Sequence, residues 1–340
     1  MVRIRYLRSA VHIALASLFI SLLPAQLLAR DYLPFLSRNQ SPLIQIFGLP
    51  VPGLAESQAP GKLQVNITGK IANNHSWDFT SDKLVYFDGE TRKALAHIGY
   101  SLSNTFALNA STVLMHHSGG ITDDFIYHFH RTFRLPQGRR ELQYNGYLNY
   151  VYRADEATRL WLSESDSQFG DTQIFSSIFI HYPEANDNLF TTFQAGVKLT
   201  TGNPDHLTGS GSVDYWGRLN SRYKFTIKNL SANLYLSFGA IRPGPFEPLH
   251  DMQKNFAGFG AAGLGLTLFP WITIQSQIDW HTPFYRSEFN QLGKLSGQII
   301  SGGTIYFSEF IQLQIGVSED VLISTASDVV FYARIRARTQ

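Results

Sequence analysis

From residue 62 to the C-terminus, hydrophobic and polar side chains alternate along the chain with a period of two. In one of these segments Ile272, Ile274 and Ile278 alternate with Gln275 and Gln277. Successive side chains of a β-strand point to opposite faces, so such a segment has one apolar face and one strongly polar face. The alternation therefore predicts a series of β-strands with the isoleucine face turned away from the glutamine face.

The lengths of the segments and of their connections favour a membrane barrel over a soluble sandwich, which also alternates. The segments reach ten residues or more, whereas soluble strands average about five or six. Short connections are expected at 103–104, 154–157, 228–229, 270 and 308–309, and long ones at 116–141, 202–212, 242–256 and 283–296. Tight periplasmic turns and longer external loops have this asymmetry.

We therefore predict an all-β fold, a transmembrane antiparallel up-and-down β-barrel of about 14 strands at residues 62–340. The expected strands are 62–73, 83–102, 105–116, 142–153, 158–167, 172–182, 188–201, 213–227, 230–241, 257–268, 271–282, 297–307, 310–318 and 327–338. Twelve strands is the alternative, because 158–182 and 297–307 alternate poorly. In this barrel the isoleucines of 271–282 contact lipid and its glutamines face the lumen.

The first 29 residues have the three-part layout of a secretory signal peptide. Arg3, Arg5 and Arg8 precede an apolar stretch at 11–23, and Ala29 stands at the expected cleavage point. The apolar stretch is short for a membrane-spanning helix, which needs about 20 residues, although an uncleaved anchor is the alternative. The sequence thus predicts export by a cleaved signal peptide 1–29 and location in the cell outer membrane.

Residues 30–61 contain five prolines and no sustained periodicity, which predicts an extended N-terminal segment, either periplasmic or tucked into the lumen. In the lumen its Leu43, Ile46 and Phe47 would need cover from water. The candidate partners on the inner wall are Tyr147, Tyr235 and Tyr332.

Charge and cysteine content exclude several other classes. Removal of the predicted signal peptide leaves 25 basic and 26 acidic residues, a net charge of −1, so no nucleic-acid partner is expected. The chain has no cysteine, which excludes a disulfide framework and thiolate metal sites.

Several motifs resemble a known family. They are Arg38-Asn39-Gln40-Ser41-Pro42, Gly48-Leu49-Pro50, Asp88-Gly89-Glu90-Thr91, Ser118-Gly119-Gly120, Asp123, Phe129-His130, Phe133, Leu135-Pro136 and Arg139. On these residues the chain resembles an uncharacterised outer-membrane β-barrel family of Gram-negative proteobacteria, a domain of unknown function. The stretch with Lys198, Thr201-Gly202, residues 207–211 and Asp214 is also similar to outer-membrane barrels of aromatic-degradation (phenol meta-pathway) operons.

The resemblance implies the barrel assembly machinery, outer-membrane lipid and lipopolysaccharide as partners. One departure concerns the C-terminus, because such barrels usually end on an aromatic residue and this chain ends on Gln340. Assembly then relies on an internal signal around Phe331 and Tyr332, or runs less efficiently.

A short loop helix is expected near 122–133, where Phe125, Phe129 and Phe133 stand four residues apart. It packs on the barrel rim or forms a constriction that folds into the lumen.

No catalytic residue, metal site or cofactor is predicted. His116, His117, His128 and His130 are close in sequence, but adjacent residues of a strand point apart and residues two apart on a helix diverge. The glycine-rich stretch 202–212 lacks the lysine of a phosphate loop and the acids of a calcium loop, so it predicts a tight external turn.

The polar faces carry the candidate solute-facing residues, which are Lys198, Arg218, Arg222, Lys224, Arg334 and Arg336. Facing the lumen, these cations would favour anionic solutes. The alternative is a network of salt bridges with Asp214, Asp279 and nearby glutamates.

The predicted function is passive passage of a small anionic or aromatic solute across the outer membrane. A closed structural or binding barrel, whose loops contact lipopolysaccharide or a protein, is the alternative. An outer-membrane hydrolase is a weaker one, because no serine and histidine stand in the pattern of outer-membrane phospholipases.

Overall fold

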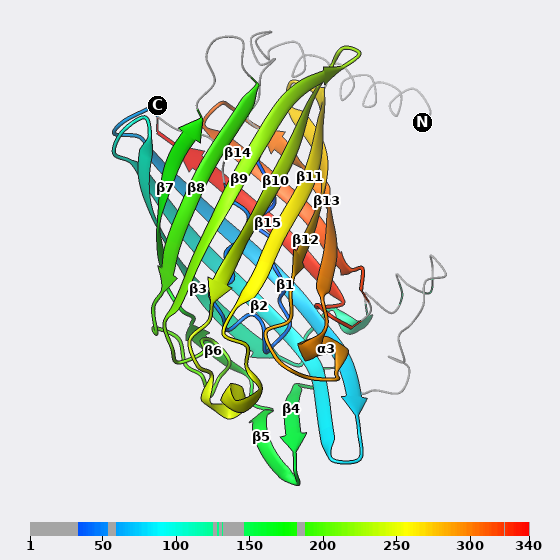
Figure 1. Cartoon of the computed structure of the whole chain (residues 1–340). Helices are drawn as coiled ribbons and strands as arrows, with labels where there is room; N and C mark the ends of the chain where they lie inside the picture. The colour runs from blue at the N-terminus through cyan, green and yellow to red at the C-terminus, as the bar shows by residue number, and fades with distance from the viewer. Residues whose placement is uncertain are drawn as a thin grey trace, which may run out of the picture.

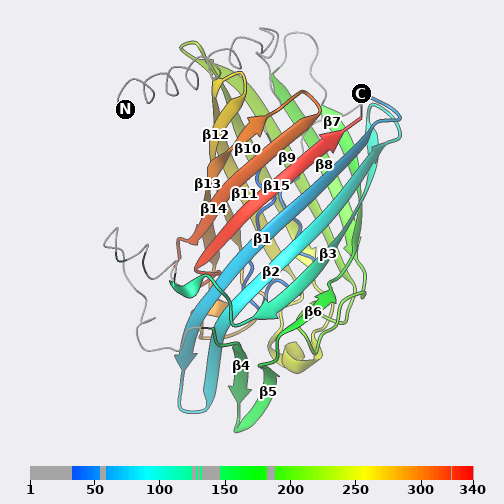
Figure 2. The same cartoon turned by 180° about the vertical axis from the view of Figure 1, so that it is seen from behind.

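The computed structural model describes residues 33–53, 59–124, 128, 131, 146–181, 188–322 and 324–339. Among these residues, twelve antiparallel strands close into a barrel (Figures 1 and 2). They are β1 (Leu63–Phe79), β2 (Lys83–Ser101), β3 (Phe106–Ser118), β7 (Gln173–His181), β8 (Leu189–Lys198), β9 (Asp214–Ile227), β10 (Leu230–Arg242), β11 (Ala257–Phe269), β12 (Ile272–His281), β13 (Ser296–Tyr306), β14 (Ile311–Asp320) and β15 (Val329–Arg338). Pairing of β1 with β15 closes the wall, and the predicted up-and-down barrel is confirmed.

The strand number is 12 rather than 14, because the expected strands 142–153 and 158–167 do not enter the wall. The chain there forms β4 (Asn149–Ala154), β5 (Ala157–Leu162) and β6 (Asp166–Phe169). These have 6, 6 and 4 residues, too few for the 9–11 that a membrane strand needs. β4 instead pairs with the outer end of β2, and β3 pairs directly with β7.

The alternation that suggested extra strands arises from this outer extension. Phe87 of β2 and Tyr150 of β4 pack edge to face at 6.0 Å. The turn 154–157, expected on the periplasmic side, joins β4 to β5 at the end of the barrel that carries the longer loops. Segment 297–307 forms wall strand β13 despite its weak alternation.

The outer face of the wall is apolar and the inner face polar, as the alternation predicts. On β12 the side chains of Ile274 and Ile278 are 44% and 49% exposed, whereas Gln275 and Gln277 are 5% and 1% exposed. Exposed apolar side chains continue around the barrel, and they include Ile67, Ile98, Leu108, Ile178, Phe193, Leu236, Leu264, Ile315 and Ile335. An outward apolar band of this kind is the surface that lipid covers.

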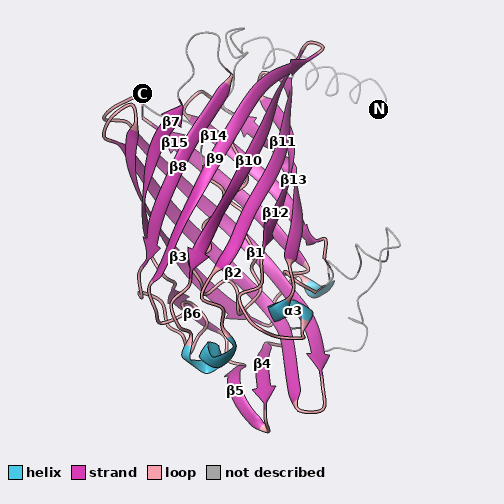
Figure 3. Cartoon of the chain, viewed as in Figure 1, coloured by secondary structure: helices cyan, strands magenta, loops and turns pink. Residues whose placement is uncertain are grey.

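The two ends of the barrel differ. Tight turns join β2 to β3, β9 to β10, β11 to β12 and β13 to β14 at the end where β15 finishes, which we assign to the periplasm (Figure 1). The other end carries longer loops with short helices, which include η2 (Glu247–Met252) and α3 (Asn290–Gly293) (Figure 3). In the described part of the chain no helix is long and apolar enough to cross a membrane.

The segment expected to be either periplasmic or in the lumen lies in the lumen. Residues 33–53, here called the plug, run inside the barrel (blue in Figure 1). Every plug residue except Arg38 and Val51 is buried. The predicted signal peptide 1–29 lies outside the described residues.

The orientation of β12 predicts the effect of a charge on each face. Ile274→Arg places a guanidinium against lipid and is expected to destabilise the barrel by about 2–4 kcal/mol near the bilayer midplane. Phe79→Arg is the control, because Phe79 is 62% exposed at the far end of β1, beside the β1–β2 turn. Urea unfolding in lipid vesicles measures both, and equal losses would contradict the assigned span.

Candidate functional site

The plug is held to the wall by side chains that take the place of a neighbouring strand. The side-chain amide of Gln277 on β12 binds both backbone groups of Phe35. Its Oε1 accepts from the Phe35 N–H at 3.0 Å, and its Nε2 donates to the Phe35 carbonyl at 3.1 Å. One glutamine side chain thus satisfies the backbone donor and the backbone acceptor of Phe35. The backbone groups of the wall strands are paired with one another and cannot do so.

The same pairing repeats along β12 with a constant offset of 242 residues. Gln275 donates to the Leu33 carbonyl at 2.9 Å, the Ser37 hydroxyl donates to Asp279, and Asn39 contacts His281 at 2.9 Å. Beyond the strand, the Tyr285 hydroxyl donates to the Leu43 carbonyl at 3.1 Å. The plug therefore runs parallel to β12. Each step of two residues along the plug matches a step of two residues along the strand.

Strands of the adjoining part of the wall complete this attachment. Gln314 of β14 also donates to the Leu33 carbonyl, at 2.8 Å, and Lys70 of β1 donates to the Leu36 carbonyl. Tyr332 of β15 packs edge to face on Phe35 at 5.5 Å. Of the three tyrosines proposed as partners, Tyr332 and Tyr235 both contact the plug. The hydroxyl of Tyr235 accepts from the Gly53 N–H and donates to Asn220. The proposal was wrong for Tyr147, which is 55% exposed outside the wall.

At the outer end the plug turns back through residues 41–47 and packs against the outer loops. The turn presents Leu43, Ile44, Ile46 and Phe47 to apolar residues of the outer loops, which include Phe246, Leu249, Phe284, Tyr285, Phe289 and Leu292. The rings of Phe47 and Phe284 stack at 4.9 Å. This buried cluster excludes water from the outer mouth.

Lys198, one of the candidate solute-facing cations, is buried beside two acids at the same end. Its Nζ lies 2.6 Å from Asp171 and 3.3 Å from Asp214. Asp214 in turn accepts from the Gly48 N–H of the plug at 2.6 Å and from the Gly244 N–H at 2.7 Å. This arrangement matches the salt-bridge alternative for Lys198, and it ties the plug to the loops.

Arg218 also contacts the plug. Its Nε donates to Gln194 at 2.8 Å, its guanidinium donates to the Val51 carbonyl, and it lies over Trp216 at 5.3 Å. A Cβ on Gly53 would come within 2.5 Å of the guanidinium, so the plug approaches Arg218 closely at a glycine.

The other candidate cations line the remaining inner wall. Arg222 and Lys224 lie over the Phe190 ring at 3.9 and 5.2 Å. Arg336 donates to Gln64 at 2.9 Å, and Arg334 lines a cavity beside the plug. Contact of any of the six with a solute stays a prediction.

Basic side chains outnumber acidic ones inside the barrel. Among the described residues, seven lysines and arginines are buried, against four acids with shielded carboxylates, namely Glu90, Asp171, Asp214 and Asp279. The Lys93 Nζ, on the inner face of β2, has no hydrogen-bond partner within the described chain. Lys70 and Lys93 were not among the predicted solute-facing residues, although both alternate with outward-facing residues of their strands.

The plug adds a further cation. Arg38 donates to the Leu49 carbonyl at 2.6 Å, which holds the two arms of the plug together. Burial lowers the pKa of Arg38 to about 10, against the opposing effect of Asp171 and Asp214, so the guanidinium stays charged at neutral pH.

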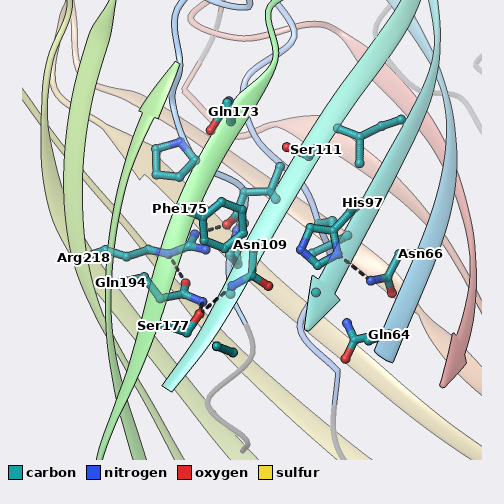
Figure 4. A pocket seen from close by; sticks show the side chains of 18 of the residues that line it. Gln64, Asn66, His97, Asn109, Ser111, Gln173, Phe175, Ser177, Gln194 and Arg218 are labelled. Atoms are coloured by element: carbon teal, nitrogen blue, oxygen red, sulfur yellow. Dashed lines mark hydrogen bonds between the residues drawn. The ribbon is translucent and has the colours of Figure 1, made fainter. Parts of the chain in front are cut away.

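A cavity remains between the plug and strands β1–β3 and β7–β9 (Figure 4). It holds about 900 Å³ of empty space, including its opening. Polar side chains on its wall are bonded to one another, with Asn66 on His97 at 2.8 Å and Gln194 on Ser177 at 2.7 Å. Ser101 and Gly99 place one end of the cavity near the periplasmic end of β2.

The described residues Asp123, Asp124, His128 and Arg131 are helical, in agreement with the short helix expected near 122–133. Its proposed constriction residues Phe125, Phe129 and Phe133 lie outside the described residues, so the constriction stays a prediction. Just before them, the Thr122 hydroxyl donates to Glu90 at 2.7 Å and Asp123 accepts from Asn73 at 2.8 Å. Both partners belong to β1 and β2 rather than to the plug.

The sequence matches one family over residues 11–338, described as "Protein of unknown function (DUF3187)". The chain belongs to this family. The predicted resemblance to an uncharacterised barrel family is thereby confirmed. No curated protein matches the sequence.

Solved structures with a similar fold are outer-membrane barrels. The COG4313 outer membrane channel from Pseudomonas putida F1 is 12% identical, with a TM-score of 0.53 over 85% of this chain and 99% of that chain. The NanC porin is 8% identical, with a TM-score of 0.43 over 81% of this chain and 99% of that chain. At such identities the first similarity supports the fold alone.

The Lys198 network predicts a large effect of removing its cation. Lys198→Met leaves Asp171 and Asp214 buried beside each other, with an expected cost of about 3–5 kcal/mol in the free energy of unfolding. Lys224→Met is the matched control, because the Lys224 side chain is only half-buried and lies over a ring. Urea unfolding of both variants tests this, and a small loss for Lys198→Met would show that the network contributes little.

Proposed function

We propose that the protein is an outer-membrane channel for small anionic solutes and that the plug closes its lumen. The observation that carries the proposal is the surplus of buried cations on the inner wall, seven against four acids among the described residues. In an interior of low dielectric such a surplus attracts anions and repels cations.

The plug is attached in a way that allows it to leave. Its contacts with β12 are hydrogen bonds through side chains, which water can replace. The chain that follows the plug returns to the periplasmic end, where the Gly61 N–H donates to the Ser101 carbonyl at 2.8 Å. Withdrawal toward the periplasm therefore breaks no strand pairing of the wall.

The setting of the channel is part of the proposal. Residues 1–29 act as a cleaved signal peptide, residues 30–61 supply the plug, and residues 62–340 form the barrel. The barrel assembly machinery inserts the chain, and its outer loops face lipopolysaccharide. The apolar outer face and the barrel fold are consistent with this setting.

Planar-bilayer conductance tests the closure. The intact protein is expected to conduct weakly, and replacement of residues 33–53 by a glycine-serine linker is expected to raise the conductance. In the opened form, Arg222→Gln combined with Arg334→Gln should shift the reversal potential away from anion preference, because both arginines are buried on the inner wall. Slower migration on a denaturing gel after boiling controls for a folded barrel.

A cysteine reporter tests whether the plug moves in the intact chain, which has no cysteine of its own. Ser37 is buried, so the cysteine of Ser37→Cys should react slowly with a maleimide. Adding Gln277→Leu removes both hydrogen bonds to Phe35 and should speed the reaction. Asn104→Cys, at the exposed β2–β3 turn, should react rapidly in both backgrounds. No change on Gln277→Leu would mean that β12 does not hold the plug.

A closed binding barrel is the second candidate, and the sealed outer mouth favours it. The apolar cluster around Phe47 and Phe284 resembles a permanent core rather than a gate. If the linker variant folds and still does not conduct, this candidate replaces the channel.

A further inference from the structure

The cavity beside the plug has the composition of an anion-binding site. Three arginines line it: Arg38 from the plug, Arg218 from β9 and Arg334 from β15. Within the described chain no aspartate or glutamate lines it. Guanidinium groups bind carboxylates through paired charge-assisted hydrogen bonds, so this wall selects a carboxylate over a neutral solute.

Two buried polar atoms of the lining have no hydrogen-bond partner in the described structure. They are the Nε1–H of Trp216, a donor, and the Oδ1 of Asn66, an acceptor. Both residues are buried, at 4% and 2% exposure, so leaving these atoms unpaired is costly. A ligand or an ordered water with an acceptor near Trp216 and a donor near Asn66 would satisfy them.

The rest of the lining suits a flat, apolar body. The rings of His97 and Phe175 lie nearly parallel, with centroids 5.7 Å apart, and Phe175 is 5.3 Å from Trp216 (Figure 4). Pro50, Val51 and Pro52 of the plug form the facing wall. Rings and prolines offer apolar surface to a planar group without consuming a polar partner.

We propose that this cavity binds a small organic carboxylate with a ring-sized planar body, with the carboxylate at Arg218 and the ring against Phe175. The proposal deepens the channel function above and rests on it for the role of the ligand, which is the solute.

The plug and the wall each contribute residues to this site, so movement of the plug would release a bound solute. Leu36, Arg38 and residues 50–53 belong to the plug, whereas Arg218 and Phe175 belong to the wall. Displacement of the plug therefore removes one side of the site and lowers its affinity. A solute bound in the closed barrel would be released as the plug moves.

Calorimetry on the intact, folded protein in detergent at low salt tests the site with benzoate as the probe. Benzamide keeps the ring without the charge, and acetate keeps the charge without the ring. Benzoate is expected to bind more tightly than either, because only benzoate uses both the arginines and the rings. Sulfate binding as tightly as benzoate would overturn the planar-body assignment.

Three variants locate the site. Arg218→Gln should weaken benzoate binding by about tenfold or more, the loss expected for a hydrogen bond to a charged group. Arg242→Gln is the control, an exposed arginine at the outer end of β10 and outside this cavity, and it should leave the affinity unchanged. Arg218→Gln also removes the hydrogen bond to the Val51 carbonyl of the plug. Trp216→Phe therefore serves as a second variant, with an expected loss of benzoate affinity of about two- to tenfold.

The outcomes separate this proposal from the channel. Absence of benzoate binding to the folded wild-type protein overturns the site, whatever the conductance of the linker variant. Equal losses for Arg218→Gln and Arg242→Gln would show an effect that is not local to the cavity and would also overturn it. Benzoate binding in a barrel whose linker variant does not conduct would support the site and assign it to a closed binding barrel.

Discussion

The pairing of plug backbone with glutamine side chains of β12 is the interaction on which the interior depends. In a closed barrel the backbone N–H and C=O groups of each strand are hydrogen-bonded to the neighbouring strands. A segment inside the barrel therefore finds no strand edge with unpaired backbone groups. Gln277 supplies a donor and an acceptor from one side chain, which imitates the edge of a strand. The prolines of the plug reduce the demand further, because Pro34, Pro42, Pro50 and Pro52 have no N–H to satisfy.

This attachment divides the lumen into two regions of different chemistry. At the outer end, the apolar turn of the plug needs cover, and the loops supply it with Phe284 and Leu249. Lys198 is buried there with two acids, so its charge is compensated. Toward the periplasmic end the wall is polar, the plug covers it incompletely, and a cavity lined by arginines remains. Two of the seven buried cations, Arg218 and Arg334, thus border this open space.

The buried cations connect the fold to the proposed passage of anions. A buried charge without a partner is costly, and a folded protein retains it only when something compensates it. Lys198 has its compensation in the fold, whereas Arg218 donates to neutral carbonyl and amide groups. A solute anion passing through the lumen would supply the compensating negative charge that these neutral groups lack.

Alternation by itself determined the barrel, the facing of residues such as Ile274 and Gln275, and the inward position of Arg218 and Arg334, because side-chain direction in a strand is a local property of period two. Alternation did not determine the number of wall strands. Tyr150 and Tyr152 also alternate in β4, but this strand pairs with β2 outside the wall. Nor could alternation choose between the lumen and the periplasm for the plug. That choice depends on partners more than 200 residues away, such as Gln277 and Tyr285, and only the closed barrel brings them together.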